Sequence, residues 1–228
     1  GKCKRQGAYK LLKVPVSNPT TPESLERFRK GNEGEKRMVD WLISKGESLH
    51  FILGNQRSVS LLANGIPMSG RMDAIRYKDR VWSIAEIKLA GKRVFTRWKR
   101  NGVFSTRPAY PAQLHGYMAA TGIWQSSFWV ADRDRMDESD AVDEGRVFEE
   151  ELAFDLSYWR TIVGEWAEAW SAIVVGKLPR PDYKGDDWHC SPAYCNWSSV
   201  CSSGKMWQHN NRSKVDAMVR SDREVEID

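Results

Sequence analysis

The stretch GRMDAIRYKDRVWSIAEIK, residues 70–88, decides the fold. Two runs that contain β-branched and aromatic residues flank the dipeptide Lys78-Asp79, and a two-residue connection between such runs is typical of a β-hairpin. A turn at Lys78-Asp79 makes Tyr77 face Arg80 across the two strands. The stretch therefore predicts two adjacent antiparallel strands.

Three ionisable side chains of this hairpin share one face in that register. Asp73 faces Ile84, and because side chains alternate along a strand, Glu86 and Lys88 point to the same side as Asp73. Neighbouring carboxylates are costly to bury unless a cation neutralises them, and oxygen ligands suit Mg²⁺ or Mn²⁺. Such an ion activates water for attack on a phosphodiester, with Lys88 beside that water. The alternative is an ordinary hairpin whose acids form salt bridges.

Hydrophobic periodicity predicts further elements around this hairpin. Thr21-Pro22 is typical of a helix start and Gly46 of a helix end, with a bend expected near Gly31. The expected elements are helices over residues 1–15, 22–45, 109–121 and 156–175 and a buried strand over residues 126–131. We expect one α/β domain over residues 1–201, followed by a polar tail over residues 202–228.

Composition limits the class of protein. The hydrophobic fraction of 41% favours a folded globular chain, and 228 residues suffice for one good core. No apolar run is long enough to cross a bilayer, and the N-terminus has no charged-then-apolar leader. We therefore expect a cytoplasmic protein without a membrane partner. The net charge of +5 and the pI near 9.0 are mildly basic.

Much of the positive charge falls within one short stretch, residues 92–107, where aromatic residues are interleaved with basic ones. Basic groups bind phosphates and aromatic rings stack on unpaired bases, so this mixture suits single-stranded nucleic acid. The residues that we expect to contact DNA here are Arg97, Trp98, Lys99 and Arg100. A solvated basic loop is the alternative.

The chain contains four cysteines, Cys3, Cys190, Cys195 and Cys201. Two disulfides are possible in principle, but an intracellular location disfavours them. Three clustered thiols and a distant fourth provide one tetrahedral sulfur set, which suits zinc or an iron–sulfur cluster. The spacing alone does not choose between these two.

In their order along the chain, these motifs resemble a known family of enzymes. Gly70 to Asp73 with Glu86-Ile87-Lys88 resembles the metal-binding core of PD-(D/E)XK nucleases. Gly31-x-x-x-Glu35, Gln113-x-x-x-Tyr117 and the cysteines narrow the resemblance to the RecB-like branch, particularly the CRISPR-associated and AddAB-type iron–sulfur nucleases. The resemblance implies a restriction-endonuclease-like core, with a central mixed sheet flanked by helices.

The resemblance also implies a set of metal ligands. These are Glu35, Asp73, Glu86 and the backbone carbonyl of Ile87. Lys88 would assist the attacking water. Many relatives carry His where this chain has Glu35, and Glu33 competes with Glu35 for the role.

A further element of the family implies contacts with a bound strand. Gln113 and Tyr117 are four residues apart and therefore lie on one face of the expected helix. Their counterparts in RecB-like nucleases lie beside the active site and contact DNA. His115 lies off that face, and we expect a structural role for it.

In the iron–sulfur members of the family, a [4Fe–4S] cluster clasps the two ends of the nuclease domain. The resemblance therefore favours such a cluster on the four cysteines, with zinc as the alternative. Cys195-x₅-Cys201 matches the usual last spacing of the family. Cys190-x₄-Cys195 departs from it, because the family usually has two residues there, and this puts the role of Cys190 in doubt.

The function implied is that of a Mg²⁺- or Mn²⁺-dependent deoxyribonuclease, an exonuclease on single-stranded DNA ends. Two alternatives stay open. One is a structure-specific or flap endonuclease on the same fold. The other is a non-cleaving DNA-binding subunit of a recombination, replication or spacer-acquisition complex. A helicase or another recombination or replication protein is the expected partner.

Overall fold

The computed structural model describes residues 3–18, 20–50, 57–133, 146–184, 187–192, 194–203 and 205–206. The chain divides into two compact units. The first spans Pro22–Ala167, and the second comprises Lys2–Thr21 and Glu168–Asp228. The expectation of one domain over residues 1–201 stays a prediction beside this division, and the predicted tail beyond Met206 lies outside the described residues. None of the described helices has the length and apolar character needed to cross a membrane.

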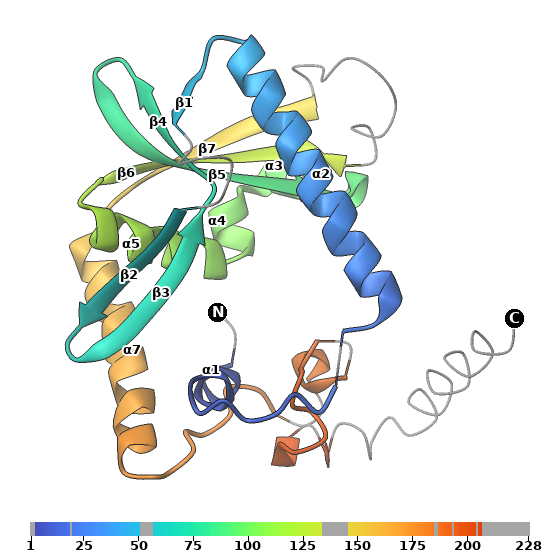
Figure 1. Ribbon diagram of the computed structural model, residues 1–228, viewed down its shortest axis with the longest axis vertical. Coiled ribbons are helices and arrows are strands. Elements are labelled where there is room, and N and C mark those ends of the chain that lie inside the picture. The colour runs from blue at the N-terminus through green and yellow to red at the C-terminus, as the bar shows by residue number, and fades with distance from the viewer. Residues whose placement is uncertain are drawn as a thin grey trace, which may run out of the picture. The chain divides into compact units, whose positions relative to one another are not determined.

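The first unit is built on a five-stranded mixed sheet (Figure 1). Its strand order is β1-β4-β5-β6-β7, and only the pairing of β5 with β6 is parallel. The strands are β1 (Ser48–His50), β4 (Ala74–Lys78), β5 (Val81–Ala90), β6 (Gln125–Asp132) and β7 (Val147–Ala153). The predicted buried strand over residues 126–131 is β6, whereas β1 and β7 were not predicted.

Helices cover both faces of this sheet, as expected. On one face, Met38 and Leu42 of α2 (Pro22–Ser44) pack against Ile87 and Trp129 of the central strands. The other face carries α3 (Lys92–Asn101), α4 (Val103–Thr106) and α5 (Ala109–Thr121) around buried Phe128. Burial of an apolar stripe from each helix against a strand face is what holds such layers together.

The hairpin turn lies one residue later than predicted. Lys78 pairs with Val81, and the turn residues are Asp79 and Arg80, with φ of 51° and 66°. Positive φ at both central residues is typical of a type I′ turn. The predicted pairing of Tyr77 with Arg80 is therefore wrong. The predicted pairing of Asp73 with Ile84 is also wrong, because Ile84 pairs with Ile75. Because the register moves by two residues, each side chain keeps its face.

A second, two-stranded sheet precedes this hairpin. Strands β2 (Arg57–Ala63) and β3 (Ile66–Met72) form a ribbon with a turn at Asn64-Gly65, where both φ angles are positive. Asn-Gly is the favoured pair for such a turn. Asp73 then bends the chain directly from β3 into β4.

Helix α2 runs without interruption through its 23 residues, so the expected bend near Gly31 is wrong. Gly34 is the tightly packed glycine of this helix instead. A Cβ atom on Gly34 would lie 2.1 Å from Cδ1 of Leu89 on β5, whereas one on Gly31 would meet nothing within 4 Å. The small residue at position 34 lets the helix approach the strand that carries the candidate site.

The second unit contains segments from the N-terminal and C-terminal parts of the chain. It contains α1 (Lys4–Leu11), the C-terminal part of α7 (Leu156–Val174) and a short 3₁₀ helix, Trp188–Cys190. Trp197 Nε1 donates a hydrogen bond to the Val14 carbonyl over 3.0 Å, and the Ser17 amide donates one to the Asn196 carbonyl over 2.9 Å. Hydrogen bonds therefore join the N-terminal segment to the C-terminal one within this unit.

Candidate active site

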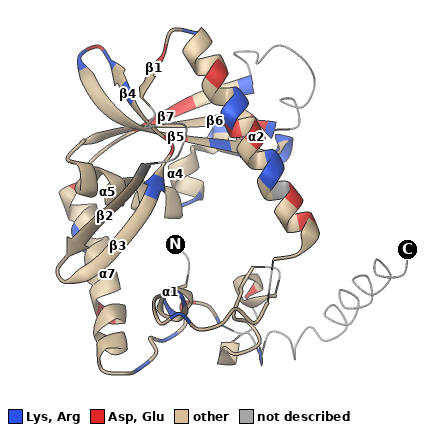
Figure 2. Ribbon diagram, in the orientation of Figure 1, with Lys and Arg blue, Asp and Glu red and all other residues tan. Residues whose placement is uncertain are grey.

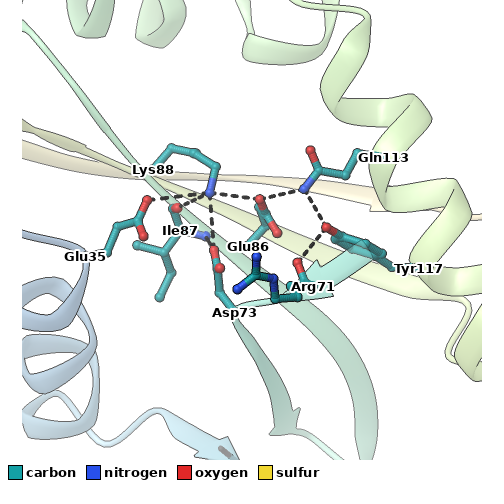
Figure 3. A network of polar contacts seen from close by, with 8 residues as sticks. All are labelled: Glu35, Arg71, Asp73, Glu86, Ile87, Lys88, Gln113 and Tyr117. Atoms are coloured by element: carbon teal, nitrogen blue, oxygen red, sulfur yellow. Dashed lines mark hydrogen bonds and ion pairs between the residues drawn. The ribbon is translucent and has the colours of Figure 1, made fainter. Parts of the chain in front are cut away.

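Four charged side chains of the first unit meet at one point (Figure 3). Asp73 lies at the bend between β3 and β4, Glu86 and Lys88 lie on β5, and Glu35 lies on α2. Lys88 Nζ is 2.8 Å from Glu86 Oε1, 3.3 Å from Asp73 Oδ2 and 3.6 Å from Glu35 Oε1. The structure thus brings together the acids and the lysine that the sequence analysis selected.

Strand alternation explains why these side chains converge. Ile87 packs against α2, so its neighbours Glu86 and Lys88 point to the opposite face of β5. The Ile87 peptide also takes part in the site. Its amide donates a 2.9 Å hydrogen bond to Asp73 Oδ2, and its carbonyl accepts one of 2.7 Å from Lys88 Nζ. Asp73 and the Ile87 carbonyl are therefore held next to each other.

The electrostatics of the site favour a bound cation. The pKa of Glu86 is raised to about 7, chiefly by burial, with the charge of Lys88 lowering it and that of Asp73 raising it. Burial also raises the pKa of Glu35, with Asp73 adding to the effect and Lys88 opposing it. Burial lowers the pKa of Lys88, but the three carboxylates outweigh it and keep the ammonium charged. Three acids surround a single ammonium, which leaves negative charge uncompensated.

One oxygen of Glu86 is a candidate ligand for a cation. Glu86 is 1% exposed, and its Oε2 has no hydrogen-bond partner among the described residues. A buried carboxylate oxygen without a partner is costly, and a hard divalent cation removes that cost. Within the described residues, no three His, Cys, Asp or Glu side chains already form a metal-binding group. The available donors are all oxygen atoms, which fits Mg²⁺ or Mn²⁺.

Helix α5 connects the carboxylates to the preceding ribbon. Gln113 Nε2 donates hydrogen bonds to Glu86 Oε1 over 2.9 Å and to the Tyr117 hydroxyl over 2.8 Å. The Tyr117 hydroxyl donates in turn to the Arg71 carbonyl over 2.6 Å. Burial, followed by the charge of Glu86, raises the pKa of Tyr117 to about 12, so the phenol stays a neutral donor. This chain of contacts positions the strand just before Asp73.

Tyr117 is 7% exposed, and its hydroxyl is bonded to the β3 backbone and to Gln113. Its expected contact with DNA stays a prediction. His115 has the expected structural role. Its ring is 1% exposed, with Nδ1 2.8 Å from the Pro111 carbonyl and Nε2 accepting a 3.0 Å hydrogen bond from the Asp155 amide.

The basic stretch is a helix and not a loop. Phe95 and Trp98 of α3 are buried, whereas Arg97, Lys99 and Arg100 are exposed. Trp98 is 5% exposed and lies edge-on to Tyr110 with ring centroids 5.9 Å apart. It therefore cannot stack on a base, and we remove it from the set of expected DNA contacts. The i, i+3 spacing of Phe95 and Trp98 was the signal for this buried face.

The four cysteines lie in the second unit and none forms a disulfide. Cys190, Cys195 and Cys201 are each 7% exposed. The pKa of Cys190 is raised to about 11, chiefly by burial and to a lesser extent by the charges of Cys201, Cys195 and Cys3. Among the described residues, no three or more Cys, His, Asp or Glu side chains are grouped as a metal site, so the structure does not show a cluster on these thiols. Their role as cluster ligands stays a prediction.

No family model matches the chain, and no curated protein matches it in sequence. Solved structures do match it. The match to the crystal structure of SSO0001 spans 89% of this chain and 83% of the SSO0001 chain, at 17% sequence identity and a TM-score of 0.53. The match to a phage-related exonuclease from Haemophilus somnus 129PT spans 72% of this chain and 75% of the exonuclease chain, at 15% sequence identity and a TM-score of 0.50.

An alkaline exonuclease from Laribacter hongkongensis also matches, over 65% of this chain and 71% of its own, at 18% identity and a TM-score of 0.48. At such identities, likeness shows the fold alone, and the first two matches carry that conclusion. They confirm the predicted α/β fold, a central mixed sheet flanked by helices.

Proposed function

We propose that this chain is a divalent-metal-dependent nuclease that hydrolyses phosphodiester bonds in DNA. The observation that carries the proposal is the buried Glu86 Oε2, an oxygen without a hydrogen-bond partner among the described residues, in a cluster where Glu86, Asp73 and Glu35 all surround Lys88. A purely structural salt-bridge cluster would satisfy that atom, because buried polar groups are normally hydrogen-bonded. The fold shared with a phage-related exonuclease supports the same class of activity.

Each side chain of the site would have a separate role in hydrolysis. Asp73, Glu86, Glu35 and the Ile87 carbonyl would hold the ion. A Mg²⁺ or Mn²⁺ ion bound there supplies a more acidic water and neutralises charge on the phosphodiester. Lys88 is protonated, so it orients the attacking water and stabilises developing negative charge instead of accepting a proton. Gln113 keeps the Glu86 carboxylate oriented through its 2.9 Å hydrogen bond.

Binding of the DNA backbone is assigned to the exposed face of α3. Arg97, Lys99 and Arg100 project from this helix, where cations release the counterions of phosphates. We propose an exonuclease that acts on single-stranded ends. Burial of Trp98 removes the stacking part of the argument for single strands, so this preference and a helicase partner now rest on the family resemblance.

The test is a cleavage assay with a matched pair of variants. End-labelled linear strands and closed single-stranded circles are incubated with Mg²⁺, with Mn²⁺ or with a chelator. Asp73→Asn should lose at least about a thousandfold in rate, because one ligand of the activating ion is lost. Asp79→Asn changes an exposed acid in the turn of the same hairpin and should keep full activity.

The outcomes separate the alternatives. Cleavage of linear strands alone supports the exonuclease, whereas cleavage of circles identifies an endonuclease. DNA binding without cleavage under any metal would identify a non-cleaving subunit. Full activity in the Asp73→Asn protein would overturn the proposed site.

We also propose that Cys3, Cys190, Cys195 and Cys201 hold a [4Fe–4S] cluster, with zinc as the alternative. The burial of Cys190, Cys195 and Cys201, the absence of a disulfide and the family resemblance support this proposal. Anaerobic purification followed by visible absorption and an iron count is the test. A colourless protein with one zinc per chain would establish the alternative, and a protein with neither metal would refute both.

A further inference from the structure

The β2–β3 ribbon presents one face that neither the core nor the carboxylate site uses. Its residues lie in three cross-strand pairs, Ser58 with Arg71, Ser60 with Ser69, and Leu62 with Pro67. All six are exposed. Side chains of the opposite face include half-buried Val59, which packs with the main core. The ribbon therefore has a core side and a solvent side that carries serines and one arginine.

We propose that this solvent face is a track for the phosphate backbone of a nucleic-acid strand, and that Arg71 binds the phosphate beside the candidate metal site. The proposal rests on the proposed nuclease function and extends its substrate site to a second element. No residue of the track belongs to the set inferred from the sequence.

Arg71 is placed for such a role by the surrounding structure. Its carbonyl accepts the 2.6 Å hydrogen bond from Tyr117, which holds its backbone next to the site. Met72 is fully buried, so strand alternation turns the Arg71 side chain outward. Arg71 precedes Asp73 by two residues, and Figure 3 draws its side chain in the same view as Asp73 and Glu86. Among the described residues the guanidinium has no hydrogen-bond or salt-bridge partner, so it is available to a ligand.

The charge of the ribbon suits a phosphate ligand. Residues 57–72 contain no Asp or Glu, although the chain as a whole contains 30 acids. Figure 2 shows the absence of acidic residues on both strands of the ribbon. Serine hydroxyls donate hydrogen bonds to phosphate oxygens without favouring a base, and arginine binds a phosphate through two parallel donors. This face therefore recognises a backbone and not a sequence.

The track has a useful length. Along β3, Arg71 is four residues from Pro67, which pairs with Leu62 near the turn. At the rise of a β-strand this distance is about 13 Å. Phosphates of one strand of a duplex follow each other about every 3.4 Å along the axis. The face thus spans a few nucleotides next to the phosphate that reacts.

The first experiment measures binding without cleavage. Fluorescence anisotropy of a labelled single-stranded oligonucleotide is recorded at several salt concentrations, in an Asp73→Asn background that prevents turnover. Arg71→Ala should weaken binding about tenfold and reduce the slope of log Kd against log salt by about 0.7, the loss of one phosphate contact. Arg71→Lys should keep the slope and recover part of the affinity, because lysine keeps the charge but not the two-donor geometry.

The second experiment tests the track beyond Arg71. Ser60→Glu places a negative charge in the middle of the face and should raise the Kd at least about fivefold. The matched control is Ser48→Glu on β1, an exposed strand position in the other sheet, which should change the Kd less than twofold. Unchanged binding in both Arg71→Ala and Ser60→Glu would overturn the track.

These outcomes are distinguishable from failure of the proposed function. If the parent protein binds DNA through Arg71 yet cleaves nothing, the track stands and the nuclease activity fails. If the parent cleaves while neither variant changes binding or KM, the activity stands and the track fails.

Discussion

Tyr117 lies against Gly70 so closely that a Cβ atom on Gly70 would be 2.5 Å from Cε1 of the ring. The same ring donates its hydroxyl to the Arg71 carbonyl, the next residue of β3. A glycine at position 70 therefore lets α5 hold the strand that ends at Asp73. Close packing against Tyr117 therefore explains why this chain has glycine at the first position of the G-x-x-D motif.

Substitution of Gly70 by Ala should displace the Tyr117 ring and with it the strand before Asp73. We expect a loss of about 1–3 kcal/mol in the free energy of unfolding, as is usual for overpacking, together with reduced cleavage. Gly116→Ala on α5 is the control, because its Cβ would meet nothing within 4 Å. Alanine inside a helix should add about 0.5–1 kcal/mol. Urea unfolding of both proteins checks this, and equal stability for Gly70→Ala and the parent would contradict it.

Removal of the ammonium from the carboxylate cluster should separate metal binding from catalysis. Lys88 Nζ lies within 3.6 Å of oxygens from three acids, so it competes with a cation for them. We expect Lys88→Met to bind Mn²⁺ about tenfold more tightly, an effect of about 1.4 kcal/mol, while cleavage falls at least about a hundredfold. Titration calorimetry and the cleavage assay measure the two effects. Weaker Mn²⁺ binding would show that Lys88 supports the ion site instead of competing with it.

The raised pKa of Glu86 makes the stability of the metal-free protein depend on pH. Between the ordinary value of 4.5 and about 7, the folded state holds a proton that the unfolded state has released. Stability from this group should therefore fall as pH rises through that window. Mn²⁺ should reverse the trend, because it binds the deprotonated form. Thermal unfolding at pH 5, 6, 7 and 8, with and without Mn²⁺, tests this, and Glu86→Gln is the control in which the dependence weakens to the part that Glu35 contributes.

The convergence of the acids was predictable from sequence, although the hairpin register was not. No glycine marks the turn, so Lys78-Asp79 and Asp79-Arg80 were equally acceptable central pairs. The two registers differ by two residues, and a period of two leaves Glu86 on the same face in either register. The prediction of the site therefore did not depend on the detail that was wrong.

Other features depend on tertiary contacts that no local pattern shows. Trp98 was expected to contact DNA because it is surrounded by basic residues, yet the core on that face of the sheet buries it. Strand β7 contains three consecutive glutamates and lacks clear alternation, so its place at the sheet edge follows from pairing with β6. A role for Arg71 was not predicted, because its exposure and its place near Asp73 depend on the bend at residue 73.

Arg76 is the centre of a buried polar network whose loss should be costly. Its side chain is 4% exposed, with Nε 2.6 Å from Glu47 Oε2 and Nη1 2.7 Å from Glu149 Oε1. Nη1 also donates to Ser127 Oγ over 3.0 Å. Arg76→Met should cost about 3–5 kcal/mol, because it removes the buried cation from Glu149 and leaves Glu47 with the exposed Lys78 alone.

Lys78 provides the comparison, since it bonds the same Glu47 from an exposed position, at 3.3 Å. Lys78→Met should cost less than about 1 kcal/mol, as is usual for surface ion pairs. Burial raises the pKa of Glu47, but Arg76 and Lys78 outweigh it and lower the pKa below the ordinary value. The stabilisation is therefore present above the unfolded pKa and lost as pH falls through the folded one. Urea unfolding at pH 7 and pH 4 should show a gap between the two variants that narrows in acid, and equal costs at pH 7 would refute the central role of Arg76.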